Sequence, residues 1–100
     1  MDIEAMQQNA CEAAERLKTL ANPSRLLVLC ALVNREHTAG ELEEIVGLSQ
    51  SAVSQHLAKL RNQELVTTRR QGQSICYSLS NENVRQILEK MHEIYCAELD

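Results

Sequence analysis

The chain has 100 residues and a formal net charge of −4 at pH 7, with neither Phe nor Trp and only two Tyr. A chain of this length is typical of one small domain, so we predict a single domain spanning residues 1–100, with a core packed from aliphatic helix faces. The N-terminal sequence is acidic and polar, and no apolar run approaches the roughly 18 residues of a membrane span. These features argue against a signal peptide or a membrane anchor and predict a cytoplasmic protein.

The first two predicted helices differ in their apolar patterns. In the first segment, apolar residues are spaced three and four apart, at Ile3, Met6, Ala10, Ala13, Leu17 and Leu20. This spacing forms a seam like that of a coiled coil, and its alanine centre lets another helix approach closely. We therefore assign a helix over roughly residues 4–20 to a helix–helix interface. Asn22 and Pro23 then begin a second helix, which we expect to be the core because residues 26–33 are apolar on nearly every side.

Two short helices are predicted next, joined by residues 47–49. Thr38 followed three residues later by Glu41 is a capping box, which begins a third helix that ends at Gly47. We expect its inward residues to be Leu42, Ile45 and Val46. Ser49 caps a fourth helix, and two short helices joined by so few residues predict a helix-turn-helix.

The fourth helix has an outward face that suits DNA. Its apolar residues Val53, Leu57 and Leu60 are spaced for burial, and this leaves an outer face of Gln50, Ser51, Ser54, Gln55 and Lys59. Amides pair with adenine, hydroxyls bond bases or phosphates, and a carboxylate would repel both strands. Residues 47–63 contain no acid. We therefore interpret this face as a major-groove reader, in preference to an ordinary solvated helix.

Residues 65–79 alternate like a β-hairpin with a basic tip. The tip contains Arg69, Arg70 and Gln73 around Gly72, and we predict that Ile75, Tyr77 and Leu79 line one face of the returning strand. Between residues 47 and 80 the balance of charge is +3, which leaves −7 for the rest of the chain. A basic hairpin beside a helix-turn-helix is a wing, whose arginines can reach phosphates or a narrow minor groove.

Asn81 caps a last helix whose apolar stripe is too broad for one contact, so we expect it to touch both its own core and a partner chain. The predicted fold is mainly α with a small β-hairpin: a winged helix-turn-helix with the hairpin between the fourth and fifth helices. There is no nucleophile elbow, phosphate loop or pair of carboxylates in an apolar setting, so we predict no catalytic residues, no cofactor and no enzyme. A pure protein-interaction module is the other class that a winged helix leaves open.

This order of elements resembles the ArsR/SmtB family of bacterial winged-helix repressors. The resemblance is carried by LANPSRLLVLCAL (20–32), LSQSAVSQHLAKLRNQELV (48–66) and RRQGQSICYSL (69–79). It implies a homodimer formed through the first and last helices. It also implies base contacts at the positions of Gln50, Ser51, Ser54 and Gln55, the same outer face that the helical spacing indicates. The expected partner is a double-stranded operator with an inverted repeat.

Two metal sites known in this family are not matched here. The third-helix site of arsenic and cadmium sensors uses a Cys-Val-Cys motif, whereas residues 41–46 contain no thiol. The last-helix zinc site needs paired Asp and His ligands, whereas this segment offers only His92 and nearby acids. We therefore predict no metal ligands at either position.

The four cysteines lack CxxC spacing and start as thiols in a reducing compartment. Cys30 in the second helix and Cys96 in the last helix resemble the thiol pair of the persulfide- and oxidant-sensing subgroup. That resemblance implies that reactive sulfur species or an oxidant links the two thiols and releases the operator. Burial of Cys30 as a small hydrophobe is the plainer interpretation of that residue alone.

Cys11 and Cys76 are interpreted as bystanders. One alternative stays open, in which Cys11 joins Cys30 or Cys96 in a soft metal site across the dimer. The chain would then be a metal-responsive repressor of the same family.

Overall fold

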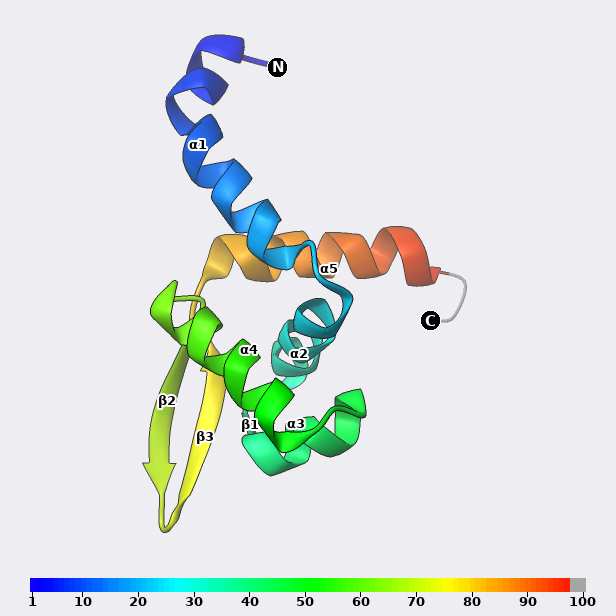
Figure 1. Ribbon diagram of the computed structural model, residues 1–100. Helices are drawn as coiled ribbons and strands as arrows, with labels where there is room; N and C mark the ends of the chain where they lie inside the picture. Colours follow the sequence, from blue (N-terminus) through cyan, green and yellow to red (C-terminus); the bar gives the residue numbers. More distant parts are fainter. Residues whose placement is uncertain (98–100) are drawn as a thin grey trace.

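The computed structural model describes residues 1–97. Their element order is α1 (Ile3–Leu20), α2 (Pro23–Asn34), β1 (His37–Thr38), α3 (Ala39–Val46), α4 (Gln50–Asn62), β2 (Val66–Gln71), β3 (Ser74–Leu79) and α5 (Glu82–Cys96). Helices α2, α3 and α4 gather on one side of α5, the β2–β3 hairpin projects beside α4, and the N-terminal half of α1 extends away from the body (Figure 1). The predicted mainly helical fold with a winged helix-turn-helix is confirmed.

The predicted helix starts are confirmed by their caps. Asn22 accepts a hydrogen bond from the Arg25 amide at 3.0 Å, and Ser49 and Asn81 cap α4 and α5 in the same way. Thr38 and Glu41 form the reciprocal capping box at the start of α3. Each cap satisfies a backbone amide that the first helical turn leaves without a partner, which is why these boundaries could be read from the sequence.

The hairpin belongs to a three-stranded antiparallel sheet in the order β1-β3-β2. Strand β1 was not predicted, because two residues are too few to show an alternating pattern. His37, expected in a loop, pairs with Tyr77 and is only 5% exposed. The sheet therefore ties the segment between α2 and α3 to the wing.

The core is aliphatic and centred on α2, whose Val28, Leu29 and Leu32 are fully or almost fully buried. The other large buried side chains come from α3, α4, the strand region and α5: Leu42, Val53, Leu57, Leu60, Leu65, Val84 and Leu88. Two expectations were wrong. Ile45 of α3 is 54% exposed and Ile75 lies beyond the core at 48% exposed, because α3 has only eight residues and the hairpin tip extends past the helices.

Helix α1 has the predicted extent but little of its seam is covered within one chain. Leu20 is buried against the core, whereas Ile3, Met6 and Leu17 are 61%, 43% and 53% exposed. Ile94 and Tyr95 of α5 are also exposed. Large apolar side chains at regular spacing on a projecting helix are typical of an interface with another chain.

Two glycines at the two ends of α3 predict opposite effects on stability. Gly47 has φ of 69°, in the left-handed region that L side chains disfavour, so Gly47→Ala should lower the free energy of unfolding by about 1–2 kcal/mol. Gly40 lies inside the helix, and a Cβ there would meet only Thr38 Oγ1 at 3.9 Å. Gly40→Ala should therefore raise stability by roughly 0.5–1 kcal/mol. Urea unfolding followed by far-UV circular dichroism, at one protein concentration, measures both. An equal change of the same sign in the two variants would contradict this account of the turn.

Candidate DNA interface and thiol pair

Helix α4 presents the predicted outer face. Val53, Leu57 and Leu60 are at most 2% exposed, and their burial fixes the rotation of the helix about its axis. The predicted DNA-facing side chains all remain exposed: Gln50, Ser51, Ser54, Gln55 and Lys59. Ser49 caps the helix start, so the backbone amides of the first turn point toward the same end. The structure thus brings these residues together on one accessible surface.

The hairpin presents two chemically different faces. Arg70 lies directly across from Ile75, and Arg69 across from Cys76. Because directly paired residues share a face and faces alternate along a strand, Arg70, Ile75 and Tyr77 lie on one side. Tyr77 lines a groove with Ser54 and Leu57 of α4, so this side is the one that meets the fourth helix. Arg70 therefore lies on the α4-facing side of the wing.

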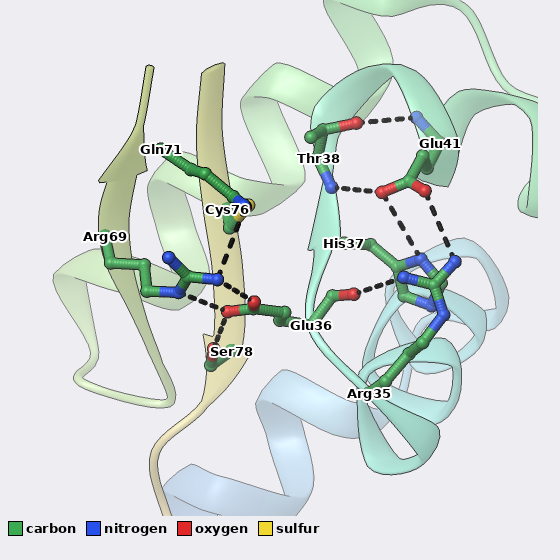
Figure 2. A network of polar contacts seen from close by, with 9 residues as sticks. All are labelled: Arg35, Glu36, His37, Thr38, Glu41, Arg69, Gln71, Cys76 and Ser78. Carbon is green, nitrogen blue, oxygen red and sulfur yellow. Dashed lines mark hydrogen bonds and ion pairs between the residues drawn. The ribbon is translucent and has the colours of Figure 1, made fainter. Parts of the chain in front are cut away.

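Arg69 is on the opposite face and is already bound to a carboxylate. Its Nε donates to Glu36 Oε2 at 2.8 Å and its Nη2 donates to Glu36 Oε1 (Figure 2). The Arg69 Nη2 also reaches Gln71 Oε1 at 3.3 Å, and Ser78 Oγ lies 3.5 Å from Glu36 Oε2. The hydrogen bond from Arg69 is the largest cause that lowers the pKa of Glu36. The predicted phosphate contact by Arg69 thus competes with an internal ion pair, whereas Arg70 bonds only to the Gly72 carbonyl among the contacts identified, at 3.2 Å.

The sequence gave no local signal for Glu36, which lies between two structural elements and resembles any solvated acid. His37 was missed for the same reason. Its ring is buried and its Nδ1 lies 3.7 Å from Glu41 Oε1. A pairing of charges 33 residues apart in the chain depends on the sheet register, which no short pattern shows.

The thiol pair was predicted by resemblance, and the structure relates the two groups electrostatically. All four cysteines are free, and Cys30 and Cys96 are both partly buried. Burial raises the pKa of the Cys30 thiol, and negative charge on Cys96 raises it further. Coulombic effects of this kind fall off with distance, so the two sulfur atoms belong to one local environment although they come from α2 and α5. Cys11 is exposed on α1, and Cys76 is buried in β3 with its Sγ 3.5 Å from Gln71 Oε1.

Cys30 lies on the wall of a cleft of about 530 Å³ between α2, α3 and α5. Apolar side chains dominate its lining, among them Leu27, Ile45 and Leu88, and Glu89 and His92 of α5 add polar groups. A small reagent can therefore approach Cys30 without unfolding of the helices. Within residues 1–97, no group of three or more His, Cys, Asp or Glu is arranged to hold a metal ion. Over the same residues no helix is long and apolar enough to cross a membrane.

Comparison with known proteins identifies the family. Residues 22–68 match the family described as bacterial regulatory protein, arsR family. The chain is 44% identical over 96 residues to the transcriptional activator HlyU of Vibrio cholerae serotype O1, an alignment that covers 96% of this chain and 89% of that protein. The chain belongs to the ArsR family of transcriptional regulators. Its relatives in this family are transcription regulators and not enzymes, and ArsR-family regulators bind DNA and are typically dimers.

Solved structures of relatives agree with this assignment. The transcriptional repressor BigR of Xylella fastidiosa superposes with a TM-score of 0.91 at 40% identity, covering 96% of this chain and 98% of that one. Reduced HlyU of V. cholerae superposes with a TM-score of 0.86 at 44% identity, covering 93% and 98%. The ArsR-family fold therefore extends over nearly the whole chain, including α1 and α5.

The geometry of α4 and the wing predicts that Gln55 and Arg70 act differently on DNA. Gln55→Ala removes a side chain that can read a base, and should cost about 1–3 kcal/mol on the preferred site with little change on unrelated DNA. Arg70→Ala should weaken binding to all sequences alike and reduce the salt dependence by about one counterion per contact. Fluorescence anisotropy across a salt series, with specific and scrambled duplexes, separates the two. Equal losses on both duplexes in both variants would remove the readout assignment.

Proposed function

We propose that this ArsR-family regulator is a homodimeric, single-domain repressor that binds an imperfect inverted-repeat operator in the cytoplasm. It releases the operator when Cys30 and Cys96 become linked through reactive sulfur species or an oxidant. The observation that carries the proposal is the electrostatic coupling of these two thiols, one on the core helix and one at the end of α5. The relatives BigR, named a repressor, and HlyU, solved in a reduced form, support it.

The chemistry at the pair is a two-electron oxidation. A thiolate attacks an electrophilic sulfur or oxygen atom, the donor's leaving group departs with the electron pair, and the second thiol then displaces that group or retains the added sulfur in the bridge. The two thiol protons go to solvent and the two electrons reduce the donor. Because the bridge joins α2 to α5, it constrains two helices that the reduced protein leaves without a covalent link.

The DNA side of the proposal rests on the shape and charge of α4 and the wing. Both α4 helices of a dimer would enter successive major grooves of an inverted repeat, with Gln50, Ser51, Ser54 and Gln55 toward the bases. Lys59, Arg70 and Gln73 are exposed and would contact the phosphate backbone. The acidic remainder of the chain would limit non-specific contacts with DNA.

A dimer through α1 and α5 accounts for the apolar side chains that a single chain leaves exposed. Ile3, Met6 and Leu17 on α1 and Ile94 and Tyr95 on α5 are the largest of them. A small domain with limited core gains stability when such faces are covered by a second copy.

The dimer proposal predicts a position-specific effect of negative charge on α1. Ala13→Glu should abolish dimer formation and operator binding, because a two-fold axis would bring two uncompensated carboxylates together in the buried seam. Gln8→Glu adds the same charge on the opposite side of α1 and should leave the dimer intact. Sedimentation velocity gives the association state of both variants. A normal Ala13→Glu dimer would show that the seam faces elsewhere.

The switch proposal predicts which thiols are required. Cys30→Ala and Cys96→Ser should each bind the operator when reduced and should ignore polysulfide or oxidant, whereas Cys11→Ser and Cys76→Ser should still respond. In the wild type, linking the thiols should weaken operator binding by a coupling free energy of about 1–3 kcal/mol. Operator anisotropy before and after anaerobic treatment measures the response, and intact mass distinguishes a disulfide from a bridge that retains sulfur.

The outcomes also decide between the two effector classes. If a folded Cys30→Ala, Cys96→Ser double variant still released its operator on treatment with sulfur donors, the thiol assignment would be wrong. Release driven by a soft metal ion in the wild type, and abolished by Cys11→Ser, would instead support the metal-responsive alternative.

A further inference from the structure

Glu36 occupies the short connection between the core helix and the sheet. It lies two residues after the end of α2 and directly before β1. Both of its carboxylate oxygens accept hydrogen bonds from Arg69 of β2, and Oε2 also faces Ser78 of β3 (Figure 2). One side chain thus joins the end of α2 to both long strands of the wing.

The same end of α2 is also joined to α5. Arg85 Nη1 of α5 donates to the Val33 carbonyl at 3.0 Å, in the last turn of α2. Glu82, one turn earlier on α5, lies 3.7 Å from Arg85 Nε. The end of α2 therefore has α5, which carries Cys96, on one side and the wing on the other.

The geometry of Arg69 argues against a direct role on DNA. Two edges of its guanidinium fork are used by Glu36 and Gln71, and its face of the hairpin is opposite to that of Arg70. A phosphate would have to displace a bidentate, charge-assisted pair. A carboxylate at the same point would also repel the DNA backbone. The arrangement suits a residue that holds the hairpin better than one that binds the operator.

We propose that Glu36 and Arg69 are positioning residues for DNA binding: their ion pair sets the angle of the wing relative to α2, so that Arg70 reaches the operator. The pair also transmits a displacement of α2 to the wing. This second part rests on the proposed linking of Cys30 and Cys96, because that linkage supplies the displacement.

The reduced protein tests the positioning role by the sign of one substitution. If the pair positions the wing, Glu36→Ala and Arg69→Ala should each weaken operator binding by about three- to tenfold, and the double variant should be no weaker than either one. The exchanged pair, Glu36→Arg with Arg69→Glu, should recover most of the lost affinity. The salt dependence should stay close to that of the wild type, since no phosphate contact is removed.

A direct phosphate contact by Arg69 predicts the opposite pattern. Glu36→Ala would then strengthen binding by freeing the arginine, and Arg69→Ala alone would weaken binding and flatten the salt dependence. Either result overturns the positioning role. Thr67→Ala, at an exposed position on the same strand, is the control and should leave operator affinity unchanged. Thermal melts establish that every variant is folded before its affinity is compared.

The second part is tested by the response to polysulfide. The ratio of operator affinities before and after treatment should be large in the wild type and should fall toward one in Glu36→Ala. An unchanged ratio in Glu36→Ala would overturn transmission through this pair while the affinities of the reduced variants still decide the positioning role. A wild type whose thiols form the bridge, as intact mass shows, but whose operator affinity is unchanged would refute the proposed function and the transmission together.

Discussion

Helix α2 packs against α1, α3, α4, α5 and β3, and its buried Val28, Leu29 and Leu32 interlock with side chains from nearly all of them. A core made only of aliphatic side chains at this density has few alternative arrangements. Any change in the position of α2 must therefore shift its neighbours as well. Cys30 lies on the same helix, on the side that faces α5 and the cleft. The packing that makes the domain stable also makes the environment of this thiol sensitive to the arrangement of the helices.

The two adjacent arginines of the wing show how strand alternation divides one charge pattern into two roles. Arg70 shares a face with Tyr77, which packs toward α4, whereas Arg69 shares a face with Cys76 and Ser78 and meets Glu36. A shift of one residue in the strand register would exchange them. The +3 balance of residues 47–80 therefore overstates the charge available to DNA, since one of its positive groups is neutralised by an acid from outside the segment.

Features set by neighbours in the chain could be predicted from the sequence, and those set by long-range pairing could not. The caps at Asn22, Thr38, Ser49 and Asn81 each satisfy an amide within one turn, so the residue type fixes the boundary. The outward face of α4 follows equally from its helical period. In contrast, β1, the burial of His37 and the Glu36–Arg69 pair arise only when distant segments meet. The relation of Cys30 to Cys96 came from resemblance, because spacing 66 residues apart carries no geometric information.

The raised pKa of Cys30 shapes the reactivity of the proposed switch. Each unit of increase lowers the thiolate fraction at neutral pH about tenfold while raising the nucleophilicity of that thiolate only about threefold, so the net reaction with a given donor slows. Slow reaction with weak donors protects the reduced, DNA-binding state and favours donors with good leaving groups. Part of the increase comes from charge on Cys96, and this repulsion acts only while both sulfur atoms can ionise. Linking them removes both charges at once, so the same proximity that disfavours ionisation of the separate thiols favours their joining.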